Sequence, residues 1–169
     1  MNYASILKCD IANGPGFRTS LFVSGCMRKC PGCFNEEAWN PNYGKYFDDV
    51  AKYKIFKELS MDYCRGLSLL GGDPMSKLGD IRKTVIELCR EVKTKFTNKD
   101  IWLWTGYTFE EIVNDNTANK IFKYVDVMID GPFVESLKDI DLVWKGSSNQ
   151  RVIDIKNTLN NGSIVLYGC

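Results

Sequence analysis

Three cysteines lie within eight residues of this chain, and their spacing constrains the fold more than any other feature. Cys26, Cys30 and Cys33 follow the pattern C-x3-C-x2-C, and Pro31-Gly32 separates the last two, where the chain must turn. Thiolates this close together can bind one soft metal centre. The spacing therefore predicts a metal-binding loop.

A closed zinc or iron-sulfur site generally needs four protein ligands, from Cys or His. The chain has no histidine, and its remaining cysteines form no second C-x2-C pair. These are Cys9, Cys64, Cys89 and Cys169. We therefore predict a 4Fe-4S cluster bound by three cysteines, with one iron open to a ligand that is not protein. A zinc site with a distant fourth ligand and an incidental group of buried cysteines remain as alternatives.

Length and composition predict one domain, residues 1–169, because 169 residues are enough for one core and short for two. The net charge is +1 and the basic residues are dispersed, which argues against nucleic acid and against an anionic membrane as partners. No apolar run approaches the roughly 20 residues of a membrane span. Seven cysteines, an odd number, and no apolar leader predict a reducing, cytoplasmic location.

The pattern of apolar residues alternates between short strands and helices. Strands are expected at residues 18–24, 66–70, 101–104, 125–129 and 151–155. Helices are expected at residues 49–61, along the apolar face formed by Leu78, Ile81, Val85, Leu88 and Val92, and after the capping box of Thr108 and Glu111. This alternation predicts an α/β fold with a mostly parallel sheet.

Four loops with unusual residues each follow one of these expected strands. They are the cysteine loop, Gly71-Gly72-Asp73-Pro74, Thr105-Gly106-Tyr107 and Asp130-Gly131-Pro132-Phe133. In a parallel sheet such loops meet at the carboxyl ends of the strands, where ligands bind. The four loops are therefore expected to form one site.

The cysteine loop, followed directly by Phe34 and Asn35, and the Gly-Gly-Asp-Pro segment together resemble the radical S-adenosylmethionine superfamily. The second motif usually reads Gly-Gly-Glu-Pro there, so Asp73 is a conservative departure. Residues 10–16, 21–35, 100–107 and 144–150 resemble, more closely, the activating proteins of anaerobic, class III ribonucleotide reductases. The resemblance runs from Met1 to about Ile155, and the tail at 156–169 lies outside it.

This resemblance implies a fold, two cofactors and two partners. The fold would be an incomplete (β/α) barrel of about six mostly parallel strands, and S-adenosylmethionine would bind the open iron of the 4Fe-4S cluster. An electron from flavodoxin or ferredoxin would produce a 5'-deoxyadenosyl radical. That radical would abstract a Cα hydrogen from one glycine of the large subunit of anaerobic ribonucleoside-triphosphate reductase.

The resemblance also implies roles for individual residues. Cys26, Cys30 and Cys33 would ligate the cluster, and no catalytic residue is expected beyond the cluster and cofactor. The cofactor-binding residues would be Phe34, Asn35, Gly71, Gly72, Asp73 and Thr105. Phe34 would pack on the adenine, or else be a core aromatic. Gly71, Gly72 and Asp73 would meet the methionine ammonium, and Thr105 would contact the methionine carboxylate or ribose, or simply cap a helix.

Functions of other classes remain open. One is an activase of another glycyl radical enzyme or a radical enzyme acting on a small molecule, although so short a chain has little material to close a metabolite pocket. Another is a non-catalytic iron-sulfur or zinc module. A ferredoxin-like carrier would use four cysteines and would not need Gly-Gly-Asp-Pro at the end of a strand.

Overall fold

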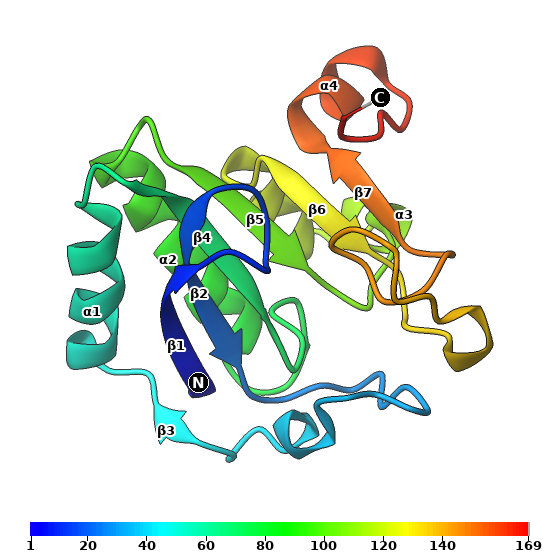
Figure 1. The fold of residues 1–169 in the computed structure, drawn as a ribbon, viewed down its shortest axis with the longest axis horizontal. Coiled ribbons are helices and arrows are strands. Elements are labelled where there is room, and N and C mark those ends of the chain that lie inside the picture. Colours follow the sequence, from blue (N-terminus) through cyan, green and yellow to red (C-terminus); the bar gives the residue numbers. More distant parts are fainter. Residues whose placement is uncertain (169) are drawn as a thin grey trace.

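The computed structural model describes residues 1–168, and these form one seven-stranded sheet in the order β3-β1-β2-β4-β5-β6-β7 (Figure 1). The strands are β1 (Asn2–Asp10), β2 (Phe17–Val23), β3 (Lys45–Tyr46), β4 (Cys64–Gly71), β5 (Asp100–Trp104), β6 (Val127–Asp130) and β7 (Arg151–Asp154). The four central strands β2, β4, β5 and β6 run parallel. The outer strands β3, β1 and β7 pair antiparallel with their neighbours.

The predicted α/β class is confirmed, but the sheet is only partly parallel and is not closed. All five expected strands are present with small shifts of their ends. β1 and β3 were not foreseen, because β1 has half-buried and exposed residues without the alternation that marks a strand. β7 lies antiparallel to β6 because the chain returns to the sheet edge through a loop instead of a crossover helix.

Both longer helices lie where the apolar pattern predicted them, with small shifts of their ends. The helices are α1 (Asp49–Leu59), α2 (Ile81–Lys95), α3 (Phe109–Val113) and α4 (Ile155–Asn161), with short 3-10 turns η1 (Glu36–Trp39), η2 (Ala118–Lys123) and η3 (Glu135–Leu137). The capping box of Thr108 and Glu111 at α3 is confirmed. Leu78 precedes α2 and packs against the core without being helical. No helix among residues 1–168 is long and apolar enough to span a membrane.

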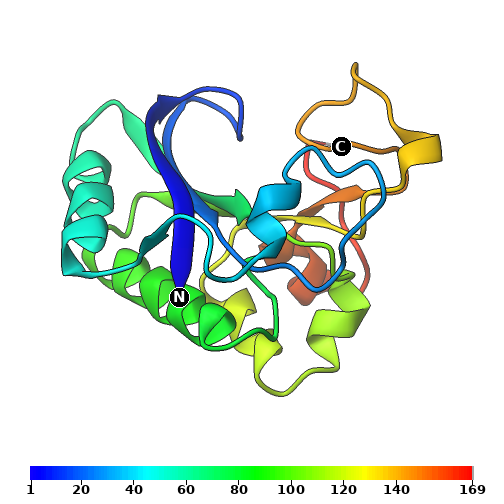
Figure 2. The same ribbon diagram turned by 90° about the horizontal axis from the view of Figure 1, so that it is seen from below.

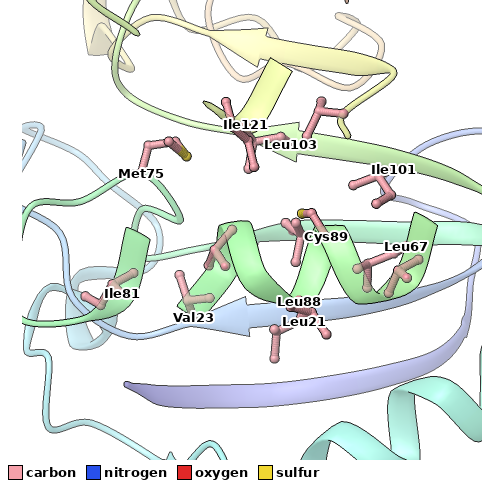
Figure 3. Close-up of a cluster of buried hydrophobic side chains, with 14 of the residues drawn as sticks. Leu21, Val23, Leu67, Met75, Ile81, Leu88, Cys89, Ile101, Leu103 and Ile121 are labelled. Atoms are coloured by element: carbon pink, nitrogen blue, oxygen red, sulfur yellow. The ribbon is translucent and has the colours of Figure 1, made fainter. Parts of the chain in front are cut away.

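All four helices contribute to one hydrophobic core on one face of the sheet, where α1 and α2 lie side by side (Figure 2). Leu88 and Cys89 of α2 meet Leu21, Leu67 and Leu103 of the central strands in this core (Figure 3). Cys64 is buried there too, so both cysteines expected in the core are there. The helices thus leave the opposite face of the sheet to loops.

That opposite face carries a second cluster, formed by Trp102, Val127 and Ile129. The tail beyond the family resemblance contributes to it: residues after α4 run back along β7, and the Tyr167 N–H donates to the Val152 carbonyl at 2.8 Å. The Tyr167 ring lies edge-on to Trp102, with 5.0 Å between ring centroids. The tail therefore covers part of the helix-free face. Cys169 lies outside the described residues.

Beside this aromatic cluster, Arg18 is fully buried in the sheet. Its guanidinium lies 2.6 Å from the Asp100 carboxylate and donates to the Ser68 hydroxyl at 2.7 Å and to the Leu67 carbonyl at 3.0 Å. A buried charge is tolerated only when it is paired and hydrogen-bonded. These partners therefore fix β2 against β4 and β5.

We expect Arg18→Met to lower the free energy of unfolding by about 3 kcal/mol, because it removes the buried partner of the Asp100 carboxylate and leaves buried acceptors unpaired. Denaturant unfolding monitored by circular dichroism measures the change. Arg65→Met is the matched control, because Arg65 pairs with the same Asp100 but is 57% exposed. It should change stability by less than about 1 kcal/mol. Equal losses in the two variants would contradict a special role for the buried pair.

Candidate metal and cofactor site

The cysteine loop starts directly after β2 and is anchored by its backbone. The Gly25 N–H donates to the Ala38 carbonyl at 2.7 Å and the Cys26 N–H to the Trp39 carbonyl at 3.2 Å. Cys26 is buried at the base of the loop, whereas Cys30 and Cys33 are half-buried on its outer part. The loop is therefore fixed at its start and more open around its last two thiols.

The three thiols share this loop without converging on a single point. No three Cys, Asp or Glu side chains within residues 1–168 are grouped so as to hold one metal ion. Burial raises the pKa of the Cys26 thiol, and the nearby Asp73 carboxylate raises it further. Three soft sulfur donors on one loop are the donor set that an iron-sulfur cluster uses, with one thiolate to each iron.

Gly71 and Gly72 bring the loop after β4 against the start of the cysteine loop. The Gly72 N–H donates to the Val23 carbonyl at 2.7 Å. A Cβ at Gly72 would lie 2.7 Å from the Ala38 carbonyl oxygen and 2.8 Å from that of Gly25, closer than real Cβ atoms approach backbone. The two glycines are thus required for the close packing of two loops, in addition to any approach to a cofactor.

Asp73 joins three loops through its backbone and its carboxylate. Its N–H donates to the Gly25 carbonyl at 3.0 Å. One carboxylate oxygen accepts from the Thr105 hydroxyl and the Met75 N–H, both at 2.8 Å, and the other accepts from the Gly106 N–H at 3.1 Å. Burial raises the pKa of Asp73, and these hydrogen bonds oppose that effect.

The four loops that follow the parallel strands do meet, as expected. Asp73 links the first three, and the Thr105 N–H donates to the Ile129 carbonyl at 2.9 Å. The Gly131 N–H donates to the Tyr107 carbonyl at 3.0 Å and so adds the fourth loop. Hydrogen bonds therefore connect every predicted loop at the carboxyl edge of the sheet.

Phe34 and Asn35 lie on the outer part of the same segment. The Phe34 side chain is 94% exposed, so the alternative of a core aromatic is wrong. The half-buried Asn35 precedes η1, and its carbonyl accepts from the Ala38 N–H at 3.1 Å. Exposure leaves the Phe34 ring free to contact a ligand or another chain.

Two residues next to the cysteines were missed by sequence reasoning. The Ser24 hydroxyl and the Arg28 Nε are buried without a hydrogen-bond partner among residues 1–168. Arg28 also forms an ion pair with Glu111, and its guanidinium carbon lies 4.3 Å from the centre of the Tyr107 ring. Buried polar atoms without partners are rare, and an ordered water molecule or a polar ligand would satisfy these two. A Ser or Arg in a loop gives no such signal in the sequence.

Asp130 and the polar segment at 147–150 hold the fourth loop. The fully buried Asp130 forms an ion pair with Arg151 and accepts from the Phe109 N–H at 2.7 Å. The Asn149 side chain donates to the Pro132 carbonyl and that of Gln150 to the Gly131 carbonyl. Residues 147–150 therefore have a folding role that their sequence did not reveal.

The profile of a family described as a 4Fe-4S single cluster domain matches residues 12–153, which include all four loops. The class of protein that this fold and site define is thus a single-cluster iron-sulfur domain.

Curated relatives give the particular family. The chain is 45% identical over 152 residues to the anaerobic ribonucleoside-triphosphate reductase-activating protein of Enterobacteria phage T4, covering 90% of this chain and 93% of the relative. Proteins of the same name from Vibrio cholerae and Escherichia coli K12 are 42% and 41% identical, covering 89% and 90% of this chain and 96% and 97% of their own lengths. The chain belongs to the family of anaerobic ribonucleoside-triphosphate reductase-activating proteins.

We expect Thr105→Val to lower the free energy of unfolding of the metal-free protein by about 1–3 kcal/mol, because the buried Asp73 carboxylate loses a donor. Thr105→Ser keeps the hydroxyl and should stay within about 1 kcal/mol of the wild type. Denaturant titration without cofactors measures both. An unchanged stability in Thr105→Val would contradict a stabilising role for this hydrogen bond.

We expect Gly72→Ala to lower the amount of iron and sulfide bound after anaerobic reconstitution, because the new Cβ displaces the backbone at Gly25 and Ala38. Gly146→Ala is the control, because its Cβ would meet only side-chain atoms, the nearest at 3.2 Å. Chemical analysis of iron and the absorbance of the sulfur-to-iron charge-transfer bands measure how much cluster the protein has bound. Full loading in Gly72→Ala would mean that the two loops can separate without disturbing the thiols.

Proposed function

We propose that this chain is a radical S-adenosylmethionine enzyme that activates anaerobic ribonucleoside-triphosphate reductase by creating a glycyl radical. Cys26, Cys30 and Cys33 would bind three irons of a 4Fe-4S cluster, and S-adenosylmethionine would bind the fourth. The family profile supports the cluster, and the names of the relatives support the partner. The relatives' names do not specify the radical chemistry, which is what the resemblance of the cysteine loop and the Gly-Gly-Asp-Pro segment to the radical S-adenosylmethionine superfamily implies.

The observation that carries this proposal is the hydrogen-bonded contact between the cysteine loop and the Gly-Gly-Asp loop. Gly72 and Asp73 donate to the Val23 and Gly25 carbonyls and hold the two loops together at the start of the cysteine motif. A cofactor bound at the open iron would therefore lie next to the backbone of Gly71 and Gly72. Neither a zinc module nor a carrier protein needs this second loop.

The chain's own residues would bind and orient the cofactor. The backbone of Gly71 and Gly72 would meet the methionine ammonium, and the unpaired Ser24 hydroxyl offers a further polar contact. Asp73 would act mainly by fixing these glycines, because both of its carboxylate oxygens already accept hydrogen bonds. Thr105 and Asn35 would contact the rest of the cofactor, and the exposed Phe34 would cover the adenine.

A cluster held by Cys26, Cys30 and Cys33 would supply one electron for the cleavage of S-adenosylmethionine to methionine and a 5'-deoxyadenosyl radical. The radical would take a hydrogen atom from a glycine Cα of the reductase large subunit and leave as 5'-deoxyadenosine. The helix-free face of the open sheet would admit that glycine segment, as in an incomplete barrel of the radical S-adenosylmethionine type. We propose flavodoxin or ferredoxin as the electron donor and the cytoplasm as the location.

The proposal is tested by anaerobic reconstitution with iron and sulfide, then addition of S-adenosylmethionine, dithionite and the reductase large subunit. We expect 5'-deoxyadenosine to form and a glycine-centred doublet to appear by electron paramagnetic resonance. Deuterium at the Cα of that glycine should appear in the 5'-deoxyadenosine. Failure of the label to transfer would refute the proposed abstraction.

Cys26→Ala, Cys30→Ala and Cys33→Ala should each abolish 5'-deoxyadenosine formation, because each removes one cluster ligand. Cys64→Ala and Cys89→Ala are controls that should keep it, since both thiols lie in the core. Retained cleavage in any of the first three would refute the ligand assignment. An equal doublet with pyruvate formate-lyase in place of the reductase would favour a less specific activase.

A further inference from the structure

Two adjoining hollows lie on the surface between the start of α2 and η2, next to the loop after β4. The larger, of about 680 Å³, is lined by four basic side chains, Lys77, Arg82, Lys83 and Lys120. The smaller, of about 340 Å³, shares Lys77 and Arg82 and also contains Tyr107. We call the two together the basic hollow.

Four basic and three acidic side chains line the basic hollow, and the acid of its smaller part, Glu111, pairs with Arg28 outside it. Two carboxylates line its larger part: Asp115, which pairs with Arg82 at 2.7 Å and with Lys77 at 3.4 Å, and Glu87, which pairs with Arg90 outside it. Among the described residues, Lys83 and Lys120 have no carboxylate within 4.0 Å of their ammonium groups. These two exposed charges are therefore free to meet a partner.

One layer of side chains joins the basic hollow to the cysteine loop. Arg28 lies between Cys26 and Cys30, and its guanidinium covers the Tyr107 ring at 4.3 Å from the ring centre. The Arg82 guanidinium faces the same ring at 5.7 Å. Tyr107 lines the hollow, so a protein bound there would be separated from the proposed cluster by this stack of Arg28, Tyr107 and Arg82.

The basic hollow also lies away from the face proposed for the glycine segment. α2 and η2 pack on the helical face of the sheet, against Leu67 and Leu103. Trp102 and Ile129 point to the opposite, helix-free face. A protein docked in the hollow would therefore not block the approach of the reductase.

We propose that the basic hollow is the docking surface for a small acidic electron-carrier protein, which delivers one electron at a time to the cluster through the Arg28 and Tyr107 side. The inference rests on the proposed function and adds where the reductant binds. Complexes between electron-transfer proteins have small interfaces and short lifetimes, and opposite charges on the two proteins accelerate their association. The carrier is oxidised by one electron and the cluster is reduced by one, so no other reactant is required.

The test compares a charge-reversed hollow with a charge-matched control. Lys83→Glu combined with Lys120→Glu replaces two unpaired positive charges with negative ones. Lys54→Glu with Lys57→Glu makes the same charge change on α1, at exposed lysines outside the hollow. Each protein is reconstituted, and its rate of 5'-deoxyadenosine formation is measured with reduced flavodoxin and, separately, with dithionite.

We expect the hollow variant to raise the KM for flavodoxin at least tenfold and to flatten the dependence of the rate on salt, with the dithionite rate unchanged. The control should stay within about twofold of the wild type with both reductants. An unchanged KM for flavodoxin in the hollow variant would overturn the proposal. An equal loss of the rate of 5'-deoxyadenosine formation with flavodoxin and with dithionite would also overturn the proposal. It would indicate that the two lysines have a structural role or bind a small anion.

A third measurement separates the carrier from the reductase as the occupant. The hollow variant, reduced with dithionite, should still give the glycine-centred doublet on the reductase at the wild-type rate. A selective loss of that doublet would assign the hollow to the reductase and overturn the proposal. If the wild type forms no 5'-deoxyadenosine with dithionite, the proposed function itself fails, which is a different result from failure of the docking surface.

Discussion

The buried Asp73 carboxylate is the interaction on which the arrangement of the site depends. A carboxylate without solvent must be satisfied by donors, and the chain supplies them from Met75, Thr105 and Gly106. Its backbone N–H reaches Gly25 at the start of the cysteine loop. Asp73 lies in the loop after β4 and forms hydrogen bonds to the loops after β2 and β5. These three loops therefore cannot move independently. The position of the thiols is thus tied to the core of the sheet.

The sheet separates two environments with different partners. On one face, the helices contribute to the hydrophobic core, and the basic hollow lies on the outer surface between α2 and η2. On the other face, Arg18, Trp102 and the tail residue Tyr167 close the end remote from the cysteine loop. These three residues do not cover the carboxyl edge of that face, which lies beside Gly72 and Ser24. In the proposed function this division would let the electron arrive from the helical side while the glycine segment approaches from the helix-free side.

The sequence predicted the meeting of the four loops better than it predicted the sheet. The cysteine spacing, the Gly-Gly-Asp-Pro turn and the periodic strands are local signals, and local signals were enough to predict that the loops meet. The direction of β7 and the presence of β1 depend on pairing at the sheet edges, which a single strand does not encode. The roles of Arg28 and Ser24 arise only from packing, so no spacing rule could have found them. The alternative of Phe34 as a core aromatic was wrong, because the path of the loop decides the exposure of this side chain and its hydrophobicity does not.

The departure from Glu to Asp in the Gly-Gly-Asp-Pro motif follows from the same packing. Asp73 is almost fully buried, and its oxygens lie 2.8 Å from the Thr105 hydroxyl and 3.1 Å from the Gly106 N–H. A longer glutamate would have to move the loop after β5 or change its rotamer, at a cost of about 1–3 kcal/mol. The shorter acid therefore matches the close approach of these two loops in this chain. In the proposed function, the acid of this motif would act through the backbone that it positions, and the glycines beside it would provide the surface that a cofactor contacts.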